Sequence, residues 1–117
     1  MPQDAKNILI AEDDEDVLLV LATYFRQVGY TVHTAQRRAE AEAILNSQAI
    51  DLIIADSSLR GTNGNTIAAS VGIPTILTSG NPAWIARLRS GATPFLAKPF
   101  RLEDLLRLAK RVLGEAP

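Results

Sequence analysis

Several short apolar runs in this sequence end in side chains that could act together on a phosphoryl group. These side chains are Glu12, Asp13, Asp56, Thr78 and Lys98. Carboxylates that share a site repel one another and therefore favour a bound cation, and oxygen ligands without His or Cys suit Mg²⁺. A lysine ammonium, a hydroxyl and a divalent ion together stabilise phosphoryl oxygens. Asp56 is the candidate nucleophile, because an aspartate carboxylate can form an acyl phosphate.

The pattern of apolar residues predicts five strands that alternate with five helices. Short apolar runs, one of them weakly alternating, predict strands at residues 7–11, 30–35, 51–56, 73–78 and 94–97. Helical spacing of apolar residues and Ala- and Glu-rich composition predict helices at residues 14–28, 37–47, 65–71, 82–90 and 101–113. This order is typical of the α/β class, here a five-stranded parallel sheet in a doubly wound (βα)5 three-layer sandwich.

Three of the predicted helices carry apolar stripes that should face the core. In helix 14–28 the stripe consists of Val17, Leu18, Leu21, Phe25 and Val28. In helix 37–47 the stripe consists of Ala39, Ala43 and Ile44. In helix 101–113 the stripe consists of Leu102, Leu105, Leu106, Ala109, Val112 and Leu113.

The candidate side chains follow four of the predicted strands, so the sheet itself would bring them together. Ligands of open parallel sheets bind beyond the carboxyl ends of the strands. Acids are also common at helix starts, where they complement the helix dipole, and we therefore assign residues 14–16 to capping and solvated charge. Taken singly, Glu12 and Asp13 fit either interpretation. Their combination with Asp56 and Lys98 favours a functional site.

The composition excludes several classes of protein. With 117 residues the chain has the size of one domain, and it has no cysteine for disulfides, thiol chemistry or Cys-ligated zinc. It has no run long enough for a membrane span and no signal-peptide pattern, so we expect a cytoplasmic domain without membrane contact. Acids outnumber bases ten to four up to residue 56, and bases outnumber acids eight to three after it. The resulting net charge of −1, without a recognition motif, disfavours nucleic acid as a partner.

Four segments together resemble the receiver domain of bacterial two-component response regulators. They are residues 8–14, residues 51–56 with Gly64, residues 73–79 and residues 91–100. The resemblance covers residues 6–113 and implies a flavodoxin-like fold, with one receiver domain over residues 1–117 and no effector domain. It further implies that Asp56 accepts a phosphoryl group from a sensor histidine kinase or a histidine phosphotransfer protein.

The resemblance also implies roles for the residues around Asp56. The Mg²⁺ ligands would be Glu12, Asp13, Asp56 and the backbone carbonyl of Ser58. Thr78 and Lys98 would contact the phosphoryl oxygens, and Phe95 takes the position of a switch aromatic that rotates as Thr78 moves toward the phosphate. This switch would act on a face formed by residues 82–90, 94–97 and 101–113. A downstream protein, or a second copy of the chain in a phosphorylation-dependent homodimer, would bind there.

The sequence also departs from the family pattern. Arg60 replaces the usual proline four residues after Asp56, and the segment between Gly64 and Ile73 is shorter than usual. The residues two after Asp56 and two after Thr78 are small, Ser58 and Gly80. We therefore expect a weakly shielded phosphoryl group that hydrolyses quickly.

Other functions remain alternatives. Arg60 and the shortened middle are also compatible with a pseudo-receiver that binds partners without phosphorylation. An FMN-binding flavodoxin would need a hydroxyl- and Gly-rich loop after the first strand, and an aspartyl phosphatase would need a second Asp at position 58; the chain has neither. We expect no enzymatic activity beyond Mg²⁺-dependent phosphorylation and dephosphorylation of the chain itself.

The sequence leaves alternatives for the domain organisation and for the surface that would bind a downstream partner. The chain is either a single-domain receiver or a piece of a longer protein. Its second half carries Trp84, Arg87, Arg89, Arg107 and Arg111 on the last two predicted helices. These residues either form a docking surface or keep the helix faces solvated.

Overall fold

The computed structural model describes residues 5–57, 59, 72–89, 91 and 93–115 of the chain. Its strands are β1 (Asn7–Ala11), β2 (Thr31–Ala35), β3 (Leu52–Asp56), β4 (Thr75–Ser79) and β5 (Phe95–Ala97). Its helices are α1 (Glu15–Gln27), α2 (Arg38–Ser47), α4 (Pro82–Arg89) and α5 (Leu102–Leu113). The helix predicted at residues 65–71 lies outside the described residues, as do Ser58 and Arg60. None of the described helices is long and apolar enough to cross a membrane.

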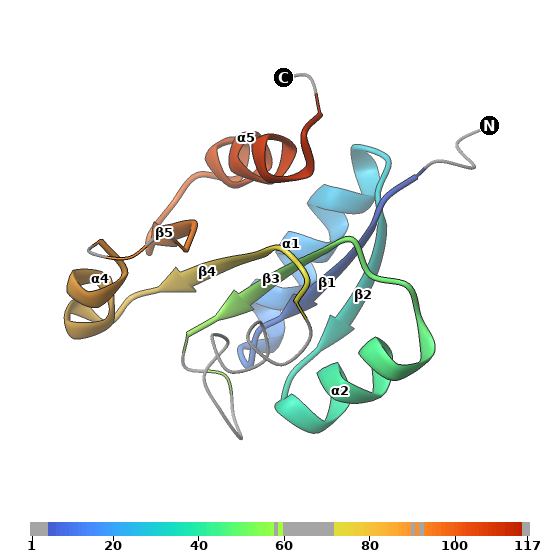
Figure 1. Cartoon of the computed structure of the whole chain (residues 1–117), viewed down its shortest axis with the longest axis horizontal. Helices are drawn as coiled ribbons and strands as arrows, with labels where there is room; N and C mark the ends of the chain where they lie inside the picture. Colours follow the sequence, from blue (N-terminus) through green and yellow to red (C-terminus); the bar gives the residue numbers. More distant parts are fainter. Residues whose placement is uncertain (1–4, 58, 60–71, 90, 92, 116–117) are drawn as a thin grey trace.

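The five strands form one parallel sheet in the order β2-β1-β3-β4-β5 (Figure 1). The predicted α/β class and five-stranded parallel sheet are confirmed. After β1 the chain adds β2 on one side and then returns to add β3 on the other, so the strand order reverses between β1 and β3. In open α/β sheets, ligands bind in the crevice that such a reversal leaves beyond the carboxyl ends of the strands.

The strands send alternate side chains into two separate apolar clusters, because neighbouring residues of a strand point to opposite faces. Ile8 and Ile10 of β1 pack in the cluster that includes side chains of α1 and α5, whereas Leu9 packs in the cluster that includes Ala41 of α2. Figure 1 shows α1 behind the sheet and α2 on its other side. Coverage of both faces explains why β1 and β3 are continuous apolar runs.

Two of the three predicted helix stripes are only partly correct, whereas the predicted stripe of α5 is buried or half-buried throughout. α1 buries or half-buries its predicted stripe up to Phe25, but Val28 is 45% exposed because the helix ends before it. In α2 the buried residue is Ala41, while Ala39 and Ala43 are exposed. The core-facing stripe of α2 therefore consists of Ala41, Ile44 and Leu45, and of the predicted stripe only Ile44 packs against the core.

A side-chain hydrogen bond joins the ends of α1 and α5 at the edge of the sheet where the strands begin. Gly29 (φ 108°) and Gly114 (φ 73°) adopt left-handed backbone conformations just after these helices. The Tyr30 hydroxyl then donates to Glu115 Oε1 at 2.6 Å, and its ring packs against Phe25 with the ring centroids 5.8 Å apart. Burial and the adjacent Glu115 carboxylate both raise the pKa of Tyr30 above its usual value.

Candidate functional site

Glu12 and Asp13 lie in the turn between β1 and α1, at the carboxyl edge of the sheet. The backbone N–H of Glu12 donates to the carbonyl of Ala35 at 2.9 Å, which extends the β1–β2 ladder past the last residue of β1. The backbone N–H of Asp14 donates to Glu12 Oε2 at 3.1 Å. These bonds hold the turn in place, and Glu12 is buried with 2% of its surface exposed.

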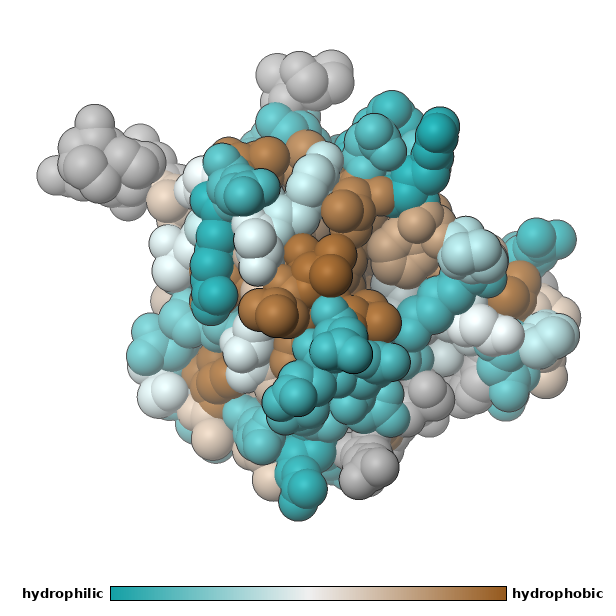
Figure 2. Space-filling model, turned by 180° about the vertical axis from the view of Figure 1, so that it is seen from behind, coloured by the Kyte–Doolittle hydropathy of each residue, from teal (hydrophilic) through white to brown (hydrophobic). Residues whose placement is uncertain are grey.

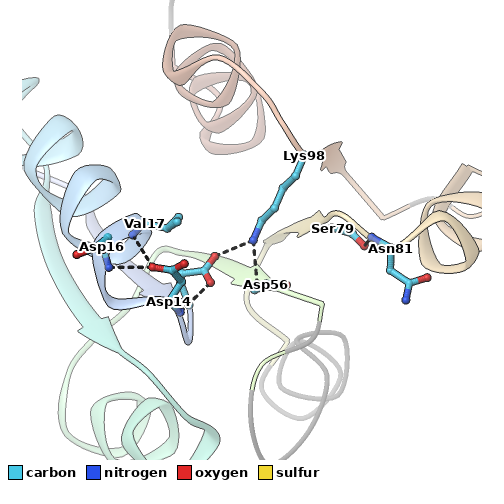
Figure 3. A network of polar contacts seen from close by, with 8 residues as sticks. Asp14, Asp16, Val17, Asp56, Ser79, Asn81 and Lys98 are labelled. Atoms are coloured by element: carbon cyan, nitrogen blue, oxygen red, sulfur yellow. Dashed lines mark hydrogen bonds and ion pairs between the residues drawn. The ribbon is translucent and has the colours of Figure 1, made fainter.

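Asp14 caps α1, as the sequence pattern predicted. Its Oδ1 accepts hydrogen bonds from the backbone N–H groups of Asp16 at 2.9 Å and Val17 at 3.2 Å (Figure 3). A carboxylate at this position satisfies N–H groups that have no partner inside the helix. The acidic block therefore divides into residues that face the sheet edge and residues that serve the helix start.

Asp56 and Thr78 end neighbouring strands in the same register. They are Cα partners in the β3–β4 ladder, and the backbone N–H of Ser57 donates to the Thr78 carbonyl at 2.8 Å. The two residues are buried, with 5% and 2% of their surface exposed. Asp56 and Thr78 therefore lie side by side on a buried, hydrogen-bonded part of the sheet.

Lys98 follows β5 and reaches across this edge toward β1 and β3. Its backbone N–H donates to the Ser79 carbonyl at 2.7 Å, and a cis peptide bond joins it to Pro99. The ammonium Nζ lies 2.9 Å from Asp56 Oδ2 and 3.0 Å from Glu12 Oε1. Figure 3 shows the lysine side chain extending toward Asp56. The sequence did not indicate that Lys98 pairs with Glu12 as well as with Asp56.

The three carboxylates lie close enough to share one cation. One oxygen from each of Glu12, Asp13 and Asp56 can be chosen such that all three oxygens lie within 4.8 Å of one another. This donor set consists of oxygen only, with one half-buried and two buried side chains. Such a set fits a hard divalent ion such as Mg²⁺, which binds a few carboxylates and keeps several waters.

Burial and neighbouring charges shift two ionisable groups of the site. Burial is the main cause that raises the pKa of Glu12 to about 7, and the charge of Asp56 adds to it, against hydrogen bonds from Asp14 and Lys98. Burial alone would lower the pKa of Lys98, but its hydrogen bonds to Asp56 and Glu12 outweigh burial and raise it. Lys98 therefore stays positively charged at neutral pH. The pKa of Glu12, in contrast, lies close to neutral pH, so small changes around it alter its charge.

The remaining predicted site residues lie around this centre. Phe95 is half-buried in β5 and packs with the cluster on the α2 side of the sheet. Gly80 lies beside the lysine stem, and a Cβ at this position would be 3.7 Å from Lys98 Cβ and 3.9 Å from Lys98 Cδ. Ser58, proposed as a metal ligand, lies outside the described residues.

An apolar groove of about 600 Å³ adjoins the lysine on the α1 side of the sheet. It is lined by Asp16, Val17, Val20, Leu21, Lys98, Pro99, Phe100 and Leu102. Figure 2 shows a patch of hydrophobic side chains near the centre of this face of the molecule. Val20 is 53% exposed although it is apolar, so the groove has an open apolar wall beside the charged site.

Comparisons with known proteins agree on one family. The model of the response regulator receiver domain matches residues 8–110. The TorCAD operon transcriptional regulatory protein TorR of Escherichia coli K12 is 34% identical over 116 residues, which cover 92% of this chain and 50% of that protein. This chain thus spans about half the length of that relative.

Solved structures give the same result. A CheY-like receiver domain protein from Methanospirillum hungatei has a TM-score of 0.82 and 25% identity, with 94% of each chain covered. The non-phosphorylated receiver domain of HemR from Leptospira biflexa has a TM-score of 0.80 and 30% identity, with 96% of this chain and 97% of that one covered.

Proposed function

The chain belongs to the receiver-domain family of two-component response regulators, and we propose that it accepts a phosphoryl group on Asp56 in a Mg²⁺-dependent reaction. The observation that carries this proposal is the position of Lys98, whose ammonium bonds both Asp56 and Glu12 in a cluster of three carboxylates. One lysine leaves two negative charges of this cluster unbalanced when all three acids are ionised. Such an excess favours a divalent cation and, with it, an incoming phosphoryl group.

The described residues supply the ligands that this chemistry needs. Glu12, Asp13 and Asp56 would hold Mg²⁺, with the Ser58 carbonyl as a further predicted ligand. When bound, the ion neutralises charge that develops on the phosphoryl oxygens during transfer.

The chain's own residues position the nucleophile and receive the phosphoryl group. A carboxylate oxygen of Asp56 attacks phosphorus, and a new O–P bond forms while the bond from phosphorus to the donor breaks and its electron pair leaves with the donor. Lys98 orients Asp56 before the reaction and afterwards pairs with a phosphoryl oxygen. Thr78, in register with Asp56, supplies a hydroxyl for a second phosphoryl oxygen.

Phosphorylation would alter the contacts of the segment that follows β5. Lys98 exchanges carboxylate partners for phosphoryl oxygens, and Phe95 lies three residues before it in β5. A change in these contacts can favour one of two conformations of β5 and its neighbouring helices. A partner that binds the surface formed by α4, β5 and α5 would then bind one conformation more tightly than the other. That partner is a downstream protein or a second copy of the chain.

We assign the donor to a sensor histidine kinase or a histidine phosphotransfer protein, acting in the cytoplasm. A protein donor must bring its phosphohistidine to the pocket, and the apolar groove beside Lys98 offers it a surface to bury. The chain itself would transform no separate substrate beyond taking up and hydrolysing its own phosphoryl group.

Incubation with Mg²⁺ and acetyl phosphate, followed by intact-mass measurement, tests the proposal. Wild type should gain one phosphoryl group, and Asp56→Asn should gain none. Asp51→Asn is the matched control, because Asp51 precedes the same strand at the opposite edge of the sheet, where its Oδ2 accepts a hydrogen bond from the backbone N–H of Asn7. An unmodified wild type would favour an interaction module that works without phosphorylation. An undiminished gain in Asp56→Asn would show that a residue other than Asp56 accepts the phosphoryl group.

A further inference from the structure

We propose that Arg37 binds the anionic phosphodonor at the mouth of the site, opposite Lys98; this inference rests on the function proposed above. A small polar cavity of about 230 Å³ lies beside the carboxylate cluster and is lined by Asp13, Gln36, Arg37 and Glu40. Asp13 belongs to both the cavity and the cluster. Arg37 thus borders the same cavity as Asp13, one of the three carboxylates of the site.

The topology places Arg37 and Lys98 on opposite sides of the acids. Arg37 comes two residues after β2 and Lys98 directly after β5, and these are the two edge strands of the sheet. The acids follow β1 and β3, between them. A phosphodonor that approaches the carboxyl edge would therefore meet one cation on each flank of the acidic cluster.

The backbone around Arg37 is held firmly. The carbonyl of Ala35 accepts the bond from Glu12 N–H, and the backbone N–H of Gln36 donates to Glu40 Oε1 at 2.6 Å. The Arg37 carbonyl accepts from Ala41 N–H at 3.1 Å as α2 begins. Arg37 therefore projects from a fixed point beside the acidic turn, although its side chain is exposed.

The guanidinium is available for a ligand. Among the described residues, its neighbour Arg38 pairs with Glu42 at 2.8 Å and Arg107 pairs with Asp104 at 2.9 Å, whereas Arg37 forms no ion pair or side-chain hydrogen bond. Lys98 already bonds two carboxylates. A planar guanidinium presents paired N–H donors that match two phosphoryl oxygens, so Arg37 suits the transient binding of a donor.

Electrostatics give this role a signature that a structural role lacks. Arg37 and Asp13 line one cavity of about 230 Å³, which is roughly 8 Å across, comparable to the Debye length at physiological salt. Over such a span the positive charge of Arg37 attracts a phosphodonor and repels Mg²⁺. Removal of its charge should therefore slow the reaction with an anionic donor and tighten Mg²⁺ binding, two effects of opposite sign.

The test compares Arg37→Gln with Arg38→Gln, a neighbouring arginine of the same helix start that is already paired. For each protein, the second-order rate constant for phosphorylation by acetyl phosphate is measured at saturating Mg²⁺, and the Mg²⁺ Kd is measured by calorimetry without phosphodonor. We expect Arg37→Gln to lower the rate constant about three- to tenfold and to lower the Mg²⁺ Kd roughly twofold, both differences shrinking at high salt. Arg38→Gln should leave both values unchanged.

Each other outcome has a definite meaning. An unchanged rate constant in Arg37→Gln, or a weakening of donor reaction and Mg²⁺ binding together, would overturn the role of Arg37 while the phosphoacceptor function stands. A wild type that gains no phosphoryl group would overturn that function and this inference with it.

Discussion

Replacement of Glu12 by Gln should remove a pH dependence of stability that the wild type carries in the absence of metal. Burial raises the pKa of Glu12 from 4.5 in the unfolded chain to about 7 in the folded one. Between these values the folded state binds more protons than the unfolded state, so the free energy of unfolding falls as pH rises. Lys98 stays protonated throughout this window, because its pKa is raised and not lowered.

The magnitude follows from the size of the shift. A difference of about 2.5 pKa units, at about 1.4 kcal/mol per unit, corresponds to at most about 3 kcal/mol lost between pH 4 and pH 8. Gln keeps nearly the same shape and cannot ionise, so Glu12→Gln should lack this loss. Saturating Mg²⁺ should also reduce the loss in wild type, because a bound cation favours the ionised carboxylate.

Urea denaturation at several pH values with a metal chelator present measures this effect. The matched control is Glu15→Gln, an exposed acid in the first turn of α1, which should retain the wild-type dependence on pH. Equal slopes for wild type and Glu12→Gln between pH 5 and pH 7 would refute the reasoning, because they would show that Glu12 titrates alike in both states.

Three further predictions concern the surroundings of the site. Gly80→Ala should have a free energy of unfolding within about 1 kcal/mol of wild type, because the added Cβ makes ordinary contact with the Lys98 stem. The same Cβ should lengthen the phosphoryl lifetime, so a shortened lifetime in a hydrolysis time course would contradict this prediction. Val20→Glu should slow phosphotransfer from a protein donor and leave the acetyl phosphate reaction unchanged. Leu19→Glu, on the same helix but outside the groove, should change neither reaction. Equal effects of the two substitutions in a phosphotransfer assay would exclude the groove as the contact surface of the donor. Phe95→Ala should preserve phosphorylation and weaken phosphorylation-dependent partner binding, so an unchanged binding isotherm would refute its role in the switch.

The sheet could be predicted because its residues are buried on both faces. Ile8, Leu9 and Ile10 must all be apolar for β1 to lie at the centre of a covered sheet, which makes the strand visible in sequence. α2 was harder to place, because alanines occur all around this helix and their small side chains give little contrast between faces. The prediction is therefore correct for the larger side chain, Ile44, and wrong for Ala39 and Ala43, in whose place Ala41 is buried.

The site was predictable to the extent that it depends on strand ends. Parallel strands bring their carboxyl ends to one edge, which accounts for Asp56, Thr78 and the acids after β1. The double pairing of Lys98 depends on the path of one long side chain across three strands, and spacing along the sequence carries no information about that path. Arg37 lies near the same edge because β2 also ends there, but Gln36 separates it from the strand, so the sequence gives it no strand-end signal.

The hydrogen bond between Tyr30 and Glu115 bears on a circular permutation of the fold, in which the two ends of the described chain are joined. The backbone N–H of Thr31 donates to the Lys6 carbonyl at 3.1 Å, and the preceding Tyr30 bonds Glu115, so residues 6 and 115 flank the same dipeptide. This dipeptide begins β2, at the end of the sheet away from the carboxylates. A circularly permuted chain, with a short linker from residue 115 to residue 6, should therefore keep both clusters and the pocket intact.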